Sequence, residues 1–365
     1  MHWGLPKMKV LFIPDYSEGN PYQKLLKRSL EEMGIEVILL NPYRMFPFFR
    51  MVLMHWKTEI IHIHWVNQLA PKNKNTIKTA LKLFMTMIDL LIVKTMKVKI
   101  IWSIHNKFTH ECVNVKGELL LRRILAKFSD KLIVHCKHVK YELGKLYKVN
   151  EKKFVIIPHG NYINYYNNVN NKRKVNSRRH LNLNRESIVF LYFGAIRKYK
   201  GIPKLLKTFD KVKHPKAELL VVGNPFEKRL KEIIVAHSKT NSGLHYVLKF
   251  VPENEVYLYF NASDIVIVPF EKILTSGSII LAMSFGKPII APLIGCIPAY
   301  LDKKGAFLYD KDDKYGLIKA IHKALNTPRK ELEKMGKHNY RKISKLDWRK
   351  IGEMTFMVYK EVLKS

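Results

Sequence analysis

Short apolar runs alternate with amphipathic stretches along the whole chain. In the first half, the apolar runs predict six strands: Lys9–Pro14, Glu36–Leu40, Ile60–His64, Lys99–Ile104, Lys131–His135 and Phe154–Pro158. Apolar residues at helical spacing separate most of these runs, and Asn20 and Pro21 are expected to begin the first helix as its N-cap and first residue. Strands that alternate with helices are typical of βαβ units. The first half is therefore predicted to form a parallel sheet covered by helices.

The second half repeats this pattern. Its apolar runs predict strands at Ser187–Phe193, Ala217–Gly223, Tyr246–Val251, Asp264–Pro269, Lys287–Pro292 and Gly305–Tyr309. Helical segments are expected to start near Pro203, Pro225, Glu253, Gly277 and Tyr315. The predicted fold is two Rossmann-like, doubly wound α/β domains that face a central cleft.

The domain boundaries follow from composition. Residues 163–185 are rich in Asn, Lys and Arg and are expected to form a solvated linker. It separates an N-terminal domain at 1–162 from a C-terminal domain at 186–345. Residues 346–365 have the spacing of an amphipathic helix, which is expected to close the fold by packing back on the N-terminal domain.

Composition narrows the class of protein. The chain has 365 residues, of which 47% are hydrophobic, so wholesale disorder is excluded. The formal net charge of +35 favours polyanionic partners: nucleic acid, an anionic membrane surface or a phosphate-bearing substrate. Because the basic residues are spread along the chain without a helix-turn-helix, zinc-finger or RNP-like pattern, we expect no specific nucleic acid.

Targeting signals and membrane spans are not apparent. Residues 1–14 carry no long apolar stretch, and the run Leu81–Trp102 is interrupted by Asp89, Lys94, Lys97 and Lys99, whereas a spanning helix needs about 20 mostly apolar residues. We therefore expect a cytoplasmic protein, peripheral on the cytoplasmic face of the membrane. The three cysteines form no CxxC pair, which argues against a cysteine-based zinc site.

One candidate site follows the strand at Lys99–Ile104. His105 is expected at the strand's carboxyl end, where ligands bind in open α/β sheets, and His110 and Glu111 follow within one short loop. A histidine there suits acid, base or hydrogen-bonding roles near neutral pH, and Glu111 can polarise or replace it. The alternative is a half-buried His105 satisfied by a backbone carbonyl.

A second candidate site is the loop after Ser187–Phe193. Gly194 permits a tight turn, and Arg197 and Lys200 bring two cations to a helix entrance that already favours anions. Arginine and lysine suit the diphosphate of an activated donor. The alternative is a solvated basic loop.

A third loop supports the second. Thr275, Ser276, Gly277 and Ser278 precede an apolar helical pattern, so hydroxyl groups and free N–H groups meet at a helix start. This arrangement predicts a second contact for the same phosphates.

Together these segments resemble a GT-B glycosyltransferase of the family 4 type (glycosyl transferases group 1). The resemblance rests on Ile100–Asn106, Asp130–His135, Val155–Tyr162, Phe193–Gly201, Tyr259–Phe270 and Thr275–Pro292. It implies that Arg197, Lys200 and Gly194 bind the donor diphosphate, that Thr275–Ser278 hold the distal phosphate or sugar, and that Val251 passes the nucleobase. It also implies that His105 is the active-site histidine.

The resemblance implies no obligatory metal, because GT-B enzymes usually rely on basic residues and helix ends. Asp310–Asp313 contains a DxD pattern, but its place before a helical run indicates N-capping. The sequence also departs from the family. Where the common pattern has a pair of glutamates, with the second heading a helix, Leu274 and Leu281 stand here.

That departure leaves the donor and the stereochemistry open. An inverting enzyme would need a general base, for which Glu111, His110, His105 and Asp15 are the candidates. A retaining enzyme would use the leaving phosphate.

Two segments of the first domain mix apolar and basic residues: Phe46–Met51 and Leu81–Lys99. This mixture suits an anionic lipid surface. The alternative is that Leu81, Phe84, Ile88, Leu91 and Ile92 pack on the domain's own sheet.

The function we expect is transfer of a hexose from a GDP-mannose or UDP-hexose type donor to a saccharide or polyprenyl-linked acceptor at the membrane surface. A basic nucleic-acid-binding protein and a GT-B sugar-nucleotide epimerase are the alternatives.

Overall fold

The computed structural model describes residues 8–71, 73–109, 112–166 and 174–365, and the chain divides into two compact units. Unit 1 comprises Met1–Gly160 together with Asp347–Ser365, and unit 2 comprises Asn161–Leu346. Each is built around one parallel sheet.

The sheet of unit 1 has six parallel strands in the order β2-β1-β3-β4-β5-β6. The strands are β1 (Lys9–Ile13), β2 (Glu36–Leu39), β3 (Ile60–Ile63), β4 (Lys99–Ser103), β5 (Lys131–Val134) and β6 (Phe154–Ile156). All six lie where the apolar runs predicted them, because buried parallel strands are apolar throughout.

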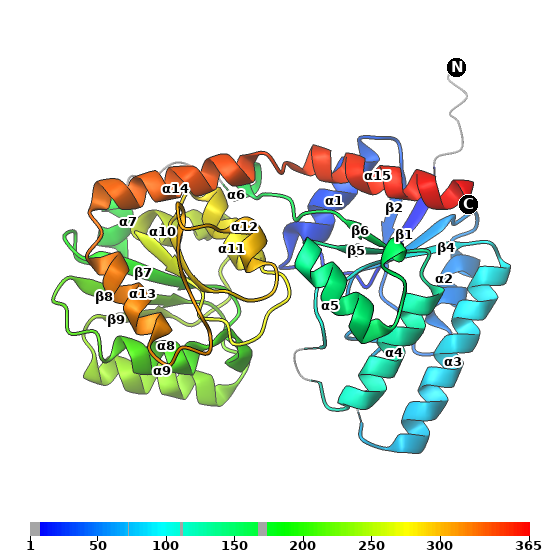
Figure 1. Cartoon of the computed structure of the whole chain (residues 1–365), viewed down its shortest axis with the longest axis horizontal. Helices are drawn as coiled ribbons and strands as arrows, with labels where there is room; N and C mark the ends of the chain where they lie inside the picture. The colour runs from blue at the N-terminus through cyan, green and yellow to red at the C-terminus, as the bar shows by residue number, and fades with distance from the viewer. Residues whose placement is uncertain (1–7, 72, 110–111, 167–173) are drawn as a thin grey trace. The chain divides into compact units, whose positions relative to one another are not determined.

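Helices cover both faces of this sheet (Figure 1). They are α1 (Pro21–Glu31), α2 (Pro47–Met54), α3 (Thr76–Thr95), α4 (Val115–Phe128), α5 (Lys137–Tyr147), the 3₁₀ turn η1 (Glu151–Lys153) and the C-terminal α15 (Trp348–Lys364). One apolar core joins α1 and α15 to the sheet.

The closing helix α15 belongs to unit 1 and packs on α1. Asp347 caps it by accepting a hydrogen bond from Lys350 N at 2.8 Å, and Ser29 Oγ of α1 donates to Trp348 O at 2.7 Å. The two helices approach so closely that a Cβ on Gly352 would lie 2.2 Å from Ser29 Oγ. The side chains of α1 therefore require glycine at this point of α15.

The sheet of unit 2 has six parallel strands in the order β12-β11-β10-β7-β8-β9. They are β7 (Ile188–Phe193), β8 (Ala217–Val222), β9 (Leu244–Val247), β10 (Ile265–Ile267), β11 (Ile289–Pro292) and β12 (Ala306–Tyr309). The edge strand β9 begins before the predicted Tyr246–Val251 and ends before Val251, because Leu244 and not Val251 packs into the core.

The helices of unit 2 surround this sheet. They are α6 (Ile163–Tyr166), α7 (Lys174–His180), η2 (Lys198–Lys200), α8 (Ile202–Phe209), α9 (Lys228–Thr240), η3 (Glu253–Glu255), α10 (Val256–Ala262), α11 (Gly277–Ser284), α12 (Ile297–Tyr300), α13 (Gly316–Leu325) and α14 (Arg329–Ser344). The apolar faces of α8, α9, α13 and α14 share one core with the strands.

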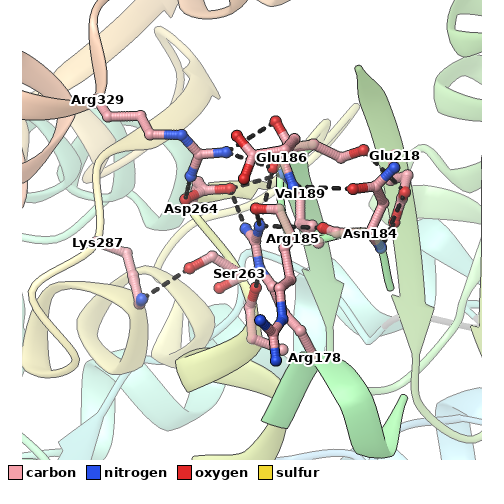
Figure 2. Close-up of polar contacts among 12 residues, drawn as sticks. Arg178, Asn184, Arg185, Glu186, Val189, Glu218, Ser263, Asp264, Lys287 and Arg329 are labelled. Carbon is pink, nitrogen blue, oxygen red and sulfur yellow. Dashed lines mark hydrogen bonds and ion pairs between the residues drawn. The ribbon is translucent and has the colours of Figure 1, made fainter. Parts of the chain in front are cut away.

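The predicted linker contributes two of these helices. Figure 2 shows Arg178 of α7 reaching Asp264 at the start of β10, with Nη2 2.5 Å from Oδ2. Arg178 also donates to four backbone carbonyl groups, and Arg329 joins the other oxygen of Asp264 at 3.2 Å. The expectation of a solvated connection fails at Arg178, because this buried and paired arginine ties α7 to unit 2, whereas neighbours such as Arg179 and Arg185 are exposed.

Within the described residues, no helix combines the length and apolar character that crossing a bilayer requires.

Candidate active site

All strands in each unit are parallel, so the loops that follow them meet at one edge of each sheet. In unit 2 the loops after β7 and β8 touch. Gly194 has a φ of +117° and Gly223 a φ of +149°, and a Cβ on Gly223 would lie 1.9 Å from Gly194 O. Only glycine permits this contact.

Lys200 and Ser278 converge on Gly194. The position that a Cβ on Gly194 would occupy lies 3.7 Å from Lys200 Nζ and 3.5 Å from Ser278 Oγ. Gly201, with a φ of +78°, lets the Lys200 loop pass against the end of β10, where a Cβ would lie 1.9 Å from Pro269 O. The structure thus brings together the glycine, the lysine and the hydroxyl-rich loop that the sequence analysis proposed as one site.

The positive charge of Lys200 is destabilised by its surroundings. Burial, with a contribution from Arg197, lowers the pKa of Lys200 to about 8. Within the described part of the chain no residue accepts a hydrogen bond from Lys200 Nζ. Arg197 stacks on Phe226, with its Cζ 3.7 Å from the ring centroid. A lysine whose charge is destabilised by burial and by a neighbouring arginine forms a site that an anion would stabilise.

The helix α11 adds hydrogen-bond donors. Ser276 is its N-cap and accepts from Ile279 N at 3.3 Å, while Gly277 is its first residue and Ser278 lies in the first turn. Thr275 precedes the cap. The predicted start of this helix is therefore correct to the residue, and the first-turn N–H groups lie beside the Ser278 hydroxyl.

Other predicted positions have different surroundings. Val251 is half-buried in the loop between β9 and η3, beside the exposed Phe250. Leu274 and Leu281, which stand in place of the family's glutamates, are 5% and 6% exposed. Their apolar side chains are packed in the interior and can make no polar contact with a ligand.

In unit 1 the equivalent edge is lined by imidazoles. His64, His105, His135 and His159 follow β3, β4, β5 and β6, and all four are buried. The ring of Tyr22, from the first turn of α1, makes edge contacts with all four at 4.8–6.0 Å between centroids. The sequence analysis singled out only His105, although a histidine after each of four successive strands was a readable signal.

The histidines contact one another. His105 lies between His64, whose Nδ1 is 3.3 Å from His105 Nε2, and His135, whose Nε2 is 3.2 Å from His105 Nδ1. The alternative that a backbone carbonyl satisfies His105 is therefore wrong, because other imidazoles do so. Burial lowers the pKa of His105 and His64 well below the usual value, and that of His135 to about 4.

Of the remaining catalytic candidates, only Asp15 lies among the residues that the structure describes. Asp15 lies in the loop after β1, where its Oδ1 accepts from Ser17 N at 2.9 Å. His110 and Glu111 lie outside the described residues.

The DxD segment has a local role. Asp310 Oδ1 accepts from Asp312 N at 2.9 Å, and Asp313 accepts from Tyr315 N at 2.8 Å and pairs with Lys319. These carboxylates order the turn that precedes α13 without capping its first N–H groups. In the part of the chain that the structure describes, no three His, Cys, Asp or Glu side chains are placed to hold a metal ion.

Residues 174–342, which make up most of unit 2, match the protein family "Glycosyl transferases group 1". A curated relative is the GDP-mannose:glycolipid 4-beta-D-mannosyltransferase of Xanthomonas campestris pv. campestris. It is 23% identical over 367 residues, which cover 98% of this chain and 93% of the relative.

Solved structures show the same fold. A sucrose-phosphate synthase from Thermosynechococcus elongatus has a TM-score of 0.77 at 14% identity and covers 98% of this chain and 100% of its own. Anabaena Alr3699/HepE in complex with UDP-glucose has a TM-score of 0.73 at 16% identity, covering 98% and 99%. The predicted class of two Rossmann-like parallel-sheet domains, GT-B, is confirmed.

Proposed function

We propose that this protein is a glycosyltransferase that moves a hexose from a nucleotide-diphosphate sugar to a glycolipid acceptor, because residues 174–342 match the group 1 glycosyl transferases and a relative of similar length is a glycolipid mannosyltransferase by name. The relative of matching length takes GDP-mannose and a glycolipid, by its name, and this favours GDP-mannose as donor.

The arrangement around Gly194 is the observation that carries the proposal. Lys200 Nζ and Ser278 Oγ lie against the same glycine, and Arg197 lies close enough to lower the pKa of Lys200. A diphosphate would supply the counter-charge that the described residues do not give Lys200, and the α11 N–H groups would donate to its oxygens. As the glycosidic bond breaks, the same groups stabilise the negative charge that develops on the leaving nucleotide.

This donor site needs no metal ion, because its positive charge comes from two side chains and a helix start. We therefore expect transfer to continue in EDTA and to gain nothing from added Mg²⁺ or Mn²⁺. A requirement for a divalent cation would contradict this part of the proposal.

A donor screen tests the proposal. GDP-mannose, UDP-glucose, UDP-galactose and ADP-glucose are offered to the full chain with a panel of octyl hexosides, and released nucleotide and new glycoside are measured. Losing one charged phosphate contact costs about 1.5–3 kcal/mol, so Arg197→Ala and Lys200→Ala are each expected to weaken donor binding more than tenfold.

Lys198 provides a matched control, since it is an exposed lysine of the same loop. Lys198→Ala should bind donor like the unmodified chain. If Arg197→Ala and Lys200→Ala also bind and turn over donor normally, this loop is not the donor site.

A glycolipid acceptor places the protein at a membrane, and unit 1 has a surface suited to one. Residues at the start of α3 and around the start of α4 expose apolar side chains: Ile77 80%, Leu81 61%, Phe84 53%, Val113 50%, Val115 55% and Leu120 48%. The two helix starts are in contact, since Asn114 Nδ2 donates to Thr79 Oγ1 at 3.1 Å. We call this set the α3–α4 surface.

Exposed lysines accompany it: Lys74, Lys78 and Lys116. Apolar side chains between cations suit the boundary of an anionic bilayer, where each cation contributes about 1 kcal/mol. We propose that this surface docks on the cytoplasmic face of the membrane.

The residues available for membrane contact differ from those that the sequence predicted. Leu81, Phe84 and Leu91 do not pack on the sheet of unit 1, since the buried face of α3 consists of Leu83, Leu90, Val93 and other residues. In the predicted segment Phe46–Met51, Phe48 and Met51 are fully buried. That part of the membrane expectation does not hold for Phe48 and Met51, although Leu53 and Met54 at the end of the same helix are 51% and 65% exposed.

Vesicle sedimentation tests the surface. The full chain should sediment with phosphatidylglycerol-containing vesicles at low salt, and Leu81→Ser with Phe84→Ser should reduce binding at least tenfold. Tyr315→Ser, which changes a 57% exposed aromatic residue of unit 2, is the control. Equal binding by the double variant and the control would exclude the α3–α4 surface.

A further inference from the structure

Three buried imidazoles of unit 1 form a continuous hydrogen-bonded series. His135 Nδ1 lies 2.8 Å from Ile157 O, His135 Nε2 lies 3.2 Å from His105 Nδ1, and His105 Nε2 lies 3.3 Å from His64 Nδ1. We call these three residues the histidine chain. They come from the loops after β3, β4 and β5, so their order follows the order of strands in the sheet.

The carbonyl of Ile157 sets the direction of the chain. A carbonyl oxygen only accepts, so His135 carries its hydrogen on Nδ1 and, when neutral, presents a lone pair on Nε2. His105 must therefore donate from Nδ1 to His135, and its own Nε2 becomes an acceptor. The same step makes His64 donate from Nδ1, which leaves the lone pair of His64 Nε2 at the end.

Burial keeps the three imidazoles of the histidine chain neutral. The rings lie among other aromatic and imidazole groups: His62 stacks on His64 at 4.3 Å, Trp65 stacks on His105 at 4.3 Å, and His159 lies 5.9 Å from His135. Tyr22 faces the chain from α1, while Tyr359 of α15 contacts His62. These neighbours lack a carboxylate that would stabilise an imidazolium, so the pKa of each ring in the chain is lowered.

The last atom of the histidine chain, His64 Nε2, is a hydrogen-bond acceptor without a donor in the described part of the protein. His64 Nε2 is buried and has no hydrogen-bond partner among the described residues. Nearly all buried polar atoms in proteins have a partner, so such an atom indicates a group that completes it. The partner must be a donor, because the direction of the chain leaves a lone pair there. Both nitrogens of His105, in contrast, are engaged by His64 and His135.

We propose that His64 Nε2 accepts a hydrogen bond from one hydroxyl group of the saccharide acceptor, and that His105 and His135 are positioning residues that fix its tautomer. This rests on the proposed function, since it takes the substrate of unit 1 to be a saccharide. It moves the substrate-contacting role from His105, the sequence candidate, to His64.

The first test is the tautomer state of the unmodified chain. With ¹⁵N-labelled histidine, nitrogen–proton correlations should show His64, His105 and His135 with hydrogen on Nδ1, whereas free histidine prefers Nε2. Saturating the protein with the octyl hexoside that gives most product should shift His64 Nε2. Hydrogen on His64 Nε2, or a resonance unchanged by the saccharide because only a bound water serves it, would overturn the inference.

The second test is kinetic. His64→Phe removes one neutral hydrogen bond to substrate, so KM for the hexoside should rise about threefold to tenfold. His64→Gln, which can present an amide oxygen, should recover part of that loss. His135→Phe should raise KM in the same direction by freeing the tautomer of His105.

His62 is the matched control. It is equally buried and stacks on His64, but its nitrogens contact Tyr359 Oη and Ser103 Oγ outside the chain. His62→Phe should lower stability and leave KM for the hexoside unchanged. An increase for His62→Phe equal to that for His64→Phe would assign the effect to packing. Failure of the unmodified chain to bind any nucleotide-sugar donor is a separate outcome, since it contradicts the proposed function itself.

Discussion

Both units are built on six parallel strands, but the carboxyl edges of the two sheets differ in charge. In unit 2 the loops after the strands bring Lys200, Arg197 and the start of α11 to one glycine. In unit 1 the corresponding loops bring four buried histidines around Tyr22, and all are held neutral. The fold decides where the functional groups gather, whereas the residues directly after each strand decide what they bind. A cationic edge suits a diphosphate, and a neutral hydrogen-bonding edge suits a sugar.

The largest expected difference between the two edges is in acid, which should destabilise unit 1 and not unit 2. Burial lowers the pKa of His62 and His159 to about 3 and of His135 to about 4, while in the unfolded chain each titrates near 6.5. The unfolded state therefore binds more protons below pH 6.5. The stabilisation is complete above that pH and is lost as pH falls toward 4 and 3, by about 2 kcal/mol for each histidine at pH 5.

Tryptophan fluorescence measures this loss in unit 1 alone, because all five tryptophans fall within its sequence. Among the described residues of unit 2 no histidine is buried, so nucleotide binding should persist at a pH where the fluorescence of unit 1 reports unfolding. If nucleotide binding were lost at the same pH as the native tryptophan fluorescence, the buried histidines of unit 1 would not be the cause of acid unfolding.

A methyl group on Gly223 should disrupt the cationic edge. In Gly223→Ala the new Cβ meets Gly194 O at a φ that side chains rarely adopt, so we expect a loss of about 3 kcal/mol or more, with weakened donor binding. Gly34→Ala is the comparison in unit 1. There the φ is +83° with nothing within 4 Å, so only the backbone cost of about 1–2 kcal/mol applies. Urea titration of both variants measures the difference, and equal losses would show that the contact with Gly194 is unimportant.

Alkaline pH should weaken donor binding at the cationic edge. With the pKa of Lys200 at about 8 in the free protein, roughly a tenth of the molecules keep the charge at pH 9, so affinity for GDP should fall about tenfold between pH 7 and pH 9. Calorimetric titration measures this, and Lys200→Arg should remove the dependence because arginine stays charged. A pH-independent affinity in the unmodified chain would exclude Lys200 as a diphosphate ligand.

Salt should produce the smallest change. Raising NaCl from 0.05 to 0.5 M shortens the Debye length to a few ångströms, so GDP affinity should fall about threefold at this half-buried site. The KM for the hexoside should stay the same, because the histidine chain carries no charge. A salt-dependent KM would show that unit 1 contributes charge to acceptor binding.

Most of the fold could be predicted from sequence because it depends on local patterns. Asn20 and Pro21 mark the start of α1 and Ser276 that of α11, since capping is read within three residues. The linker was mispredicted for the opposite reason. Arg178 is basic and looks solvated, but its partner Asp264 lies 86 residues away.

The candidate sites likewise divide into features set by neighbouring residues and features set by residues that are distant in the sequence. The Gly194 loop carries its glycine and its cations within seven residues, so it could be identified in the sequence. The role of His105 could not, because it depends on His64 and His135, 41 residues before it and 30 residues after it. Only the register of three parallel strands brings these rings into line.

The return of α15 to unit 1 has a consequence for how the molecule is made. Unit 2 is one uninterrupted stretch and can finish folding while synthesis continues, whereas unit 1 must wait for residues 347–365 before Trp348 and Tyr359 can complete its interior. The half that is translated first is therefore the last to mature, and a nascent chain stalled before residue 347 should bind nucleotide while its leading half still recruits chaperones.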